Sequence, residues 1–386
     1  METDDILKYI RHERGRNIMI EYLYINNYKS FVNFRMDFNK SNLLIGQNGT
    51  GKSNVFVVIA AIRDIINGVS NTINECFSQE TITRWMKSNI QTFEMGLKDR
   101  DFGYMYRLEI EHDASSTNTR ILSERVLCDG DIIYQMSNGN AEVYDDDHNI
   151  GRVLADSNTS GIAFVPMDNR HRKIKGFREQ IARIILCTPN PKAMPDIVQN
   201  DIYVPKIDFS NIASTFAGVV LTDPDIYSDL ADTFRGISPG FYKARISVDQ
   251  FFKRLILDYN HNGTSCSYYF SELSDGERML FALYTLLYGF IKKGKIVLLD
   301  EPDNYLSLTE IQPWCINMEK ELAEDGQCIM ISHHPEIIDY MAETDGIWMS
   351  RLSSGDSKIT SGPNIGDNKD LLTYSEMITR GLLDEA

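Results

Sequence analysis

One segment of the sequence has the residue types and the spacing of a loop that holds phosphate groups. Residues Gly46–Ser53 satisfy the pattern GxxxxGK[ST] and lie between apolar runs at 43–45 and 54–67, which suit a strand and a helix. The glycines let the backbone curl, so that its N–H groups and the positive end of the helix point at phosphate oxygens. Lys52 is expected to reach the β- and γ-phosphates, and the Ser53 hydroxyl to bind Mg²⁺. The residues predicted to hold the nucleotide here are Gly46, Asn48, Gly49, Gly51, Lys52 and Ser53.

A second segment delivers two adjacent carboxylates at the end of an apolar run. Residues 296–299 are all apolar and are followed by Asp300 and Glu301. In this position Asp300 would hold Mg²⁺, through water, and Glu301 would orient or deprotonate an attacking water molecule. Such a pair is common by itself, and it gains weight because the phosphate loop accompanies it.

Two further segments have polar residues that suit an anion. Ser274 and Gly276, in the run 273–278, would present a hydroxyl and backbone N–H groups at a helix start, although a plain helix cap is the simpler interpretation on local grounds. The strand-like run 329–331 is followed by Ser332, His333 and His334. An imidazole there could hydrogen-bond a γ-phosphate, whereas a single histidine is more often an ordinary surface residue.

The elements that must position these residues follow from the pattern of apolar residues. Strands are expected at 18–25, 31–38, 43–45, 93–112, 120–134, 296–299 and 328–331, and helices at 54–67, 174–186, 225–235 and 279–291, with a helical lobe beginning at 247–258. Compact apolar runs followed at once by charged residues are typical of buried parallel strands whose carboxyl ends carry a site. The predicted fold class is α/β, with a parallel-sheet core, an antiparallel β subdomain and a helical lobe.

Composition excludes several classes of protein. The 386 residues include 39 Lys and Arg against 55 Asp and Glu, a net charge of −16, and 42% are hydrophobic, so wholesale disorder and bulk coating of nucleic acid are both excluded. The N-terminus is too charged for a signal peptide, and the longest uncharged apolar run, 279–291, is too short to span a bilayer. The six cysteines have no metal-like spacing. We expect a soluble cytoplasmic protein with reduced thiols and no membrane partner.

Charge is unevenly distributed along the chain. The segment 161–186 has a local charge of +4, and the segment 194–233 has a local charge of −6. The basic cluster between Arg170 and Arg183 could contact the phosphates of a nucleic acid, an acidic partner or the acidic segment itself. A solvated surface or an intramolecular contact is the more common role of such a cluster.

The order of these segments along the chain resembles that of the ABC-type ATPase head. In that family the motifs follow one another as Walker A, signature, Walker B, D-loop and H-loop. That resemblance implies a P-loop NTPase with ABC-ATPase topology, in which Ser274 and Gly276 contact the γ-phosphate bound by a second copy. It matches His333 to the H-loop histidine. The sequence departs from the family pattern at Asp275, Glu277 and Ser307, and it offers only Gln79 and Gln91 as Q-loop candidates.

The segment between the phosphate loop and the signature indicates which branch of the family the chain resembles. It contains 220 residues between Ser53 and Ser274, with six prolines between 189 and 239 that break any extended helix. Asn27–Phe31, ahead of the phosphate loop, and Ser332–Asp339, near the end, resemble the SMC/RecF/OLD side of the superfamily, and the prolines of the insert indicate a head of that side without a coiled coil. Compact ATPases of that side serve in anti-phage systems such as Septu, retron and PARIS, which implies a separate nuclease or toxin as effector.

The leading hypothesis is therefore an ATP-hydrolysing switch that dimerises around ATP and Mg²⁺, with Glu301 and His333 catalytic and with Ser53 and Asp300 at the metal. The alternatives are a slow-ATPase scaffold that sequesters an effector, a RecF-like DNA-repair ATPase, and a transporter subunit. The expected parts are a nucleotide-binding core at 17–68 and 290–350, a β meander and insert at 69–246, a helical lobe at 247–289 and a C-terminal extension at 351–386, all within a single bilobal head.

Overall fold

The computed structural model describes residues 19–70, 72–113, 118–199, 203–248, 251–322, 326–360 and 373–380. The chain divides into two compact units. Of the described residues, the loop unit comprises those between 19 and 184 and between 341 and 380, and the signature unit comprises those between 185 and 340. Each unit is described by itself.

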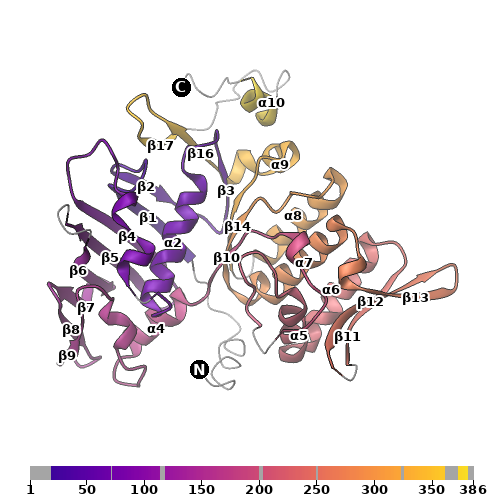
Figure 1. Cartoon of the computed structure of the whole chain (residues 1–386), viewed down its shortest axis with the longest axis horizontal. Helices are drawn as coiled ribbons and strands as arrows, with labels where there is room; N and C mark the ends of the chain where they lie inside the picture. Colours follow the sequence, from indigo (N-terminus) through magenta and orange to yellow (C-terminus); the bar gives the residue numbers. More distant parts are fainter. Residues whose placement is uncertain are drawn as a thin grey trace. The chain divides into compact units, whose positions relative to one another are not determined.

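The loop unit is built around an antiparallel sheet with the strand order β2-β1-β4-β5-β6-β7-β8-β9, drawn in indigo to magenta (Figure 1). Its strands are β1 Met19–Asn26, β2 Phe34–Asp37, β4 Ile90–Lys98, β5 Gly103–His112, β6 Thr119–Cys128, β7 Asp131–Ser137, β8 Asn140–Tyr144 and β9 Ile150–Leu154. Buried and partly exposed residues alternate along the whole of β5, as expected for a strand with one face in a core. The meander predicted at 93–134 is confirmed.

The loop unit also holds a parallel strand pair and several helices. The pair is β3 Ser41–Ile45 with β16 Gly346–Arg351, and β17 Ser357–Thr360 returns antiparallel to β16. The helices are α2 Lys52–Ile66, α3 Ile73–Cys76, η1 Gln79–Thr81, η2 Gly161–Phe164, α4 Arg172–Ile181 and α10 Tyr374–Thr379. Ten of the fifteen residues of α2 are buried, so the helix is part of the core. The strand and helix expected around Gly46–Ser53 are confirmed as β3 and α2.

The signature unit combines a small antiparallel sheet, a parallel strand pair and a group of helices. Its strands are β11 Phe241–Val248, β12 Lys253–His261, β13 Thr264–Tyr269, β14 Ile296–Asp300 and β15 Gln327–Ile331. Its helices are η3 Pro191–Ala193, α5 Ile212–Thr222, α6 Pro224–Ile237, η4 Phe270–Glu272, α7 Asp275–Gly289, η5 Ile291–Lys293 and α8 Leu308–Leu322. The division between the units falls within α9 Pro335–Asp345 and within β10 Ile184–Cys187, after its first residue. Residues 279–288 of α7 are all buried, and β14 and β15 pair in parallel, as the apolar runs predict.

Two expected elements are wrong. The helical start predicted at 247–258 is instead the end of β11 and most of β12, because Leu255, Leu257 and Tyr259 are buried at a spacing of two residues. The helix predicted at 174–186 ends at Ile181, and Ile184–Cys187 forms β10. Among the residues that the structure describes, no helix is both long enough and apolar enough to cross a membrane.

Candidate functional site

The phosphate loop joins β3 to α2 through a backbone that only glycine accommodates. Gly49 and Gly51 have φ values of 84° and 103°, in the left-handed region. A β-carbon at Gly51 would lie 2.8 Å from the ring of Phe31, and one at Gly46 would lie 2.2 Å from the carbonyl oxygen of Met349. The loop is therefore shaped by the packing around it as well as by its own sequence.

Contacts inside the loop hold its curled form. Lys52 is 6% exposed, and its Nζ donates to the carbonyl oxygens of Gly46 at 2.7 Å and Gln47 at 3.0 Å. Thr50 Oγ1 donates to the same Gln47 carbonyl at 2.9 Å. Asn48, Gly49 and Ser53 are exposed. The lysine is thus already directed into the loop, and these three of the residues predicted to meet a nucleotide are accessible.

Residues far away in the sequence buttress the same loop. Ser357 Oγ, on β17, donates to the Thr50 carbonyl oxygen at 2.7 Å and lies 2.7 Å from Ser30 Oγ. The backbone N–H of Ser357 donates to the Ser30 carbonyl oxygen at 2.8 Å. The run Asn27–Phe31 carries part of the family resemblance, but no local motif indicates that Ser30, Phe31 or Ser357 contacts the loop, because only the pairing of β3 with β16 brings this hairpin to it. Sequence reasoning missed these residues for that reason.

Asp300 and Glu301 lie at the carboxyl end of β14, as predicted. Asp300 pairs in register with Ile331 of β15, and the N–H of Glu301 donates to the Ile331 carbonyl oxygen at 2.9 Å. Glu301 has a φ of 50°, which is unfavourable for a residue with a side chain by about 1 kcal/mol. Asn304 Nδ2 donates to Glu301 Oε2 at 2.8 Å. The backbone and an amide therefore fix the direction of this carboxylate.

A second carboxyl group lies beside Glu301 in the interior. Asp303 is 9% exposed, and burial raises the pKa of its carboxyl group while a hydrogen bond with Ser332 opposes that rise. The Ser332 hydroxyl also accepts the N–H of His334 at 2.9 Å. His333 is exposed on this turn. The turn after β14 and the turn after β15 are thus joined by Asp303 and Ser332, which brings Glu301 and the histidine turn together within the signature unit.

The predicted signature residues begin α7. Ser274 is the N-cap of this helix: its Oγ accepts the N–H of Glu277 at 3.3 Å and donates to Glu277 Oε2 at 2.7 Å, which completes a capping box. A β-carbon at Gly276 would lie 3.2 Å from the Tyr305 carbonyl oxygen. The helix start therefore packs against the turn that follows Glu301, and the glycine allows that approach.

The structure settles one of the two Q-loop candidates. Gln91 is fully buried, and its Nε2 donates to the Asn27 carbonyl oxygen at 2.9 Å, while Oε1 lies 2.9 Å from His112 Nε2. This amide belongs to a buried network in the meander, so the assignment of Gln91 as a Q-loop residue is wrong. Gln79 lies in η1 and is partly exposed.

The two charged segments have ion-pair partners near them in the fold. In the basic cluster, Arg172 pairs with Asp146 at 2.6 Å, while Arg170 is exposed. In the acidic segment, Asp196 pairs with Arg254 at 2.8 Å and Asp229 with Lys292 at 2.9 Å. Much of the acidic segment is thus neutralised by basic residues of its own unit.

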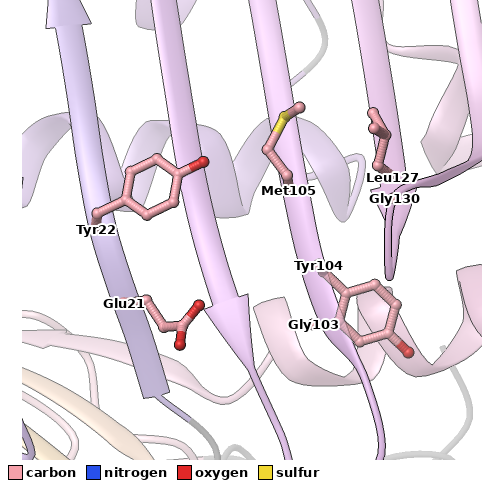
Figure 2. Close-up of a pocket in the computed structure, with 7 residues that line it drawn as sticks. All are labelled: Glu21, Tyr22, Gly103, Tyr104, Met105, Leu127 and Gly130. Carbon is pink, nitrogen blue, oxygen red and sulfur yellow. The ribbon is translucent and has the colours of Figure 1, made fainter.

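A small pocket lies on the meander sheet. It has a volume of about 190 Å³ and is lined by Glu21, Tyr22, Gly103, Tyr104, Met105, Leu127 and Gly130. Figure 2 shows Glu21 and Tyr22 on β1 and the residues of β5 and β6 beyond the strand that lies between them, which is β4. None of them belongs to the predicted nucleotide site, so the pocket and the phosphate loop are separate features of the loop unit.

Comparisons with known proteins agree with the predicted fold. Residues 41–339 match a family described as "AAA domain, putative AbiEii toxin, Type IV TA system". No curated protein matches the chain. Among solved structures, the chain is similar to an SMC head bound to the C-winged helix domain of ScpA, with 17% identity, a TM-score of 0.54 and coverage of 88% of this chain and 97% of that one.

The chain is also similar to the SMC head domain from Thermotoga maritima, with 14% identity, a TM-score of 0.49 and coverage of 88% of this chain and 98% of that one. The first likeness, over nearly the full length of both chains, shows the fold. The protein has the P-loop fold of ABC-type ATPase heads, and the predicted fold class and its placement on the SMC/RecF/OLD side are confirmed.

Proposed function

The chain belongs to this AAA-domain family, and on that premise we propose that it is an ATP-hydrolysing molecular switch that closes with a second copy around ATP and Mg²⁺. The observation that carries the proposal is the phosphate loop. Its glycines take conformations that side chains disfavour, and Lys52 is directed into it. A loop held in this form has its backbone donors arranged before a nucleotide arrives, which lowers the entropic cost of binding.

The residues present fit ATP and Mg²⁺. In the proposed complex, Lys52 and the loop N–H groups bind the phosphates, and Ser53 and Asp300 hold the metal, the latter through water. Bound Mg²⁺ would supply positive charge that offsets the charge developing on the phosphates. The exposure of Ser53 and the position of Asp300 at the carboxyl end of a parallel strand support these roles.

Hydrolysis in this proposal depends on two side chains of the signature unit. Glu301 orients the attacking water and accepts its proton, and Asn304 keeps the carboxylate in one direction. His333 donates a hydrogen bond to the γ-phosphate from the exposed turn after β15. The link between Asp303 and Ser332 would keep the two turns in register during the reaction.

The switch itself is proposed to arise between two copies. Ser274 and Gly276 of each copy would contact the γ-phosphate in the other, so that hydrolysis opens the pair and releases or activates an effector, a nuclease or toxin on another chain. The family description names a putative toxin of a type IV toxin–antitoxin system, which supports a role in a system of that kind. The SMC head in the similar structure is bound to a separate winged-helix domain, which supports partner docking by heads of this fold.

Two variants test the ATPase proposal. Lys52→Ala should weaken nucleotide binding at least about 100-fold, because a buried charged donor to the phosphates is lost. Glu301→Gln should leave the dissociation constant of ATP within about threefold of the wild type and lower turnover at least about 100-fold, because general-base catalysis contributes that much or more. Isothermal titration and phosphate release measure the two effects.

Wild-type turnover in Glu301→Gln would rule out Glu301 as the base. Equal nucleotide affinity in Lys52→Ala and the wild type would rule out the phosphate loop as the site. The effector part has a separate readout: the protein encoded beside this gene should co-purify with Glu301→Gln in ATP and not with Lys52→Ala. Co-purification that is the same with and without bound nucleotide would favour the scaffold alternative over a switch.

A role in DNA repair is the second candidate, and the exposed Arg170 at the start of the basic cluster is the observation in its favour. Because Arg172 is paired with Asp146, fewer charges are available there than the sequence suggests. Duplex DNA binding that weakens steeply with salt and is lost on neutralising Arg170 and Arg172 would support this candidate. Binding that survives those changes would exclude the cluster as its site.

A further inference from the structure

We propose that Arg351 is a second cation of the phosphate loop and that its guanidinium binds a phosphate oxygen of the nucleotide held there. This residue lies outside every motif considered above, at the end of β16. The inference rests on the proposed function, since it assumes a nucleotide in the loop, and it adds a residue from the C-terminal hairpin to that site.

The path of β16 brings Arg351 to the loop. Strand β16 runs parallel to β3, with Trp348 opposite Ile45 at the end of that strand. It then continues past the end of β3, so that the Met349 carbonyl oxygen would be only 2.2 Å from a β-carbon at Gly46. Two residues further on, Arg351 Nη1 would be 4.0 Å from a β-carbon at Gly49. The guanidinium therefore lies beside the middle of the phosphate loop.

The hairpin that carries Arg351 is held in a single position. Arg351 Nε donates to the Gly355 carbonyl oxygen at 2.9 Å, across the turn between β16 and β17. Trp85 Nε1 donates to Asp356 Oδ1 at 2.7 Å, which ties the turn to the body of the unit. Ser357 then contacts the Thr50 carbonyl oxygen. Because both strands are fixed to the loop or its surroundings, the guanidinium is placed before any ligand binds.

The charge of Arg351 is not neutralised within the part of the chain that the structure describes. Its side chain is exposed and forms no ion pair with the described residues, although the chain carries 55 acidic residues. The contact with Gly355 uses only Nε, so the terminal nitrogens keep their donors. A planar guanidinium with two free nitrogens binds phosphate in a bidentate manner, which a lysine ammonium cannot reproduce.

The proposal makes the C-terminal hairpin part of the nucleotide site. Lys52 approaches the phosphates from the start of α2, and Arg351 would approach from the opposite strand of the parallel pair. Together they provide two positive charges for a ligand with three to four negative charges. The chain is acidic overall, yet Arg351 forms no ion pair with a described carboxylate and lies beside an exposed glycine of the loop. A phosphate bound in the loop would be the anionic partner of this cation.

The test compares the nucleotide affinities of Arg351→Ala, Arg351→Lys and Lys358→Ala in the full chain. Lys358 is the matched control, because it is a cation on the same hairpin, opposite Ser350 in the strand pairing. Isothermal titration with ADP and with ATP, in Mg²⁺, gives the dissociation constants. Thermal unfolding without nucleotide reports whether each variant keeps its stability.

The proposal expects Arg351→Ala to weaken binding of ATP or ADP at least about tenfold, as for loss of a charged hydrogen bond. Arg351→Lys should recover part of that loss, and Lys358→Ala should bind like the wild type. Wild-type affinity of Arg351→Ala for both nucleotides would overturn the proposal. It would also be overturned if Arg351→Ala loses affinity together with unfolding temperature and Arg351→Lys does not restore the affinity. Lys52→Ala separates the proposals, because normal binding by that variant contradicts the site itself.

Discussion

The two helices that carry the predicted phosphate contacts begin in opposite ways. Helix α2 has a glycine, Gly51, at its N-cap, and no side chain caps its first N–H groups. Helix α7 begins with Ser274 and closes its own end through a capping box with Glu277. The first end is therefore open to an anion, whereas the second already has an intramolecular partner for its donors.

Because of this difference, we expect the start of α2 to bind phosphate in the single chain and the start of α7 to bind phosphate only in the ATP-bound pair. At α2 the loop is buttressed by Ser357, so an incoming phosphate meets a loop that is already curled, and Lys52 exchanges its contacts with the Gly46 and Gln47 carbonyl oxygens for the phosphate. At α7 a phosphate would have to replace Glu277 at the Ser274 hydroxyl, and the carboxylate repels it. The net gain at the signature should therefore be small, which suits a contact between copies that forms with ATP and breaks after hydrolysis.

The largest expected difference between the two regions is in nucleotide binding when one glycine of each is replaced by alanine. Gly46→Ala should abolish measurable nucleotide binding, because its β-carbon would overlap the Met349 carbonyl oxygen and the backbone must move. Gly276→Ala should leave nucleotide binding by the isolated chain unchanged: its β-carbon would lie 3.2 Å from the Tyr305 carbonyl oxygen, which must shift slightly, but that turn is not part of the phosphate loop. Equilibrium titration with a fluorescent ADP analogue measures both. Equal losses in the two variants would contradict the distinction between the regions.

These regions are predictable from the sequence where their contacts join residues close together in the chain, and not where the contacts join distant residues. The phosphate loop and the Asp300–Glu301 pair were predictable because a run of consecutive residues specifies each, with an apolar strand just before it. Arg351 and Ser357 were not, because their place beside the loop results from the pairing of β16 with β3. The buried role of Gln91 likewise depends on His112, at the end of β5, and on Asn27, just after β1.

One failure was avoidable in principle. The alternation of Leu255, Leu257 and Tyr259 has the period of a strand, and it lies within residues expected to start a helical lobe. The apolar residues of this segment were interpreted as the start of a helical lobe, whereas their spacing of two favoured β12. The signature helix α7 starts only at Asp275, after a three-stranded sheet. Local periodicity was the better guide in this segment.

An intermediate effect is expected from Glu277→Gln, which keeps the capping geometry and removes the charge beside Ser274. The dissociation constant of the ATP-bound pair should fall about two- to fivefold, the usual scale for one partly exposed like charge. Sedimentation in the Glu301→Gln background, where hydrolysis is stalled, measures the pair. Ser274→Ala is the opposite control: it should weaken the pair and lower stability by about 1 kcal/mol through loss of the cap. Weaker pairing by Glu277→Gln would show that the carboxylate assists the contact.

The smallest effect concerns Asp303, which joins the two catalytic turns within the signature unit. Because burial raises its pKa in the folded chain, the unfolded chain releases this proton at lower pH, and stability falls as the pH rises above about 4 towards the raised value. Asp303→Asn stays uncharged and can still bond Ser332, so its unfolding temperature should exceed that of the wild type at pH 7 by a margin that shrinks at pH 5. Asp131→Asn, at an exposed position, should show no such trend. If Asp303→Asn instead unfolds at a lower temperature at pH 7, the Asp303 carboxylate is held in its charged form by its partners, and the link between the turns is ionic.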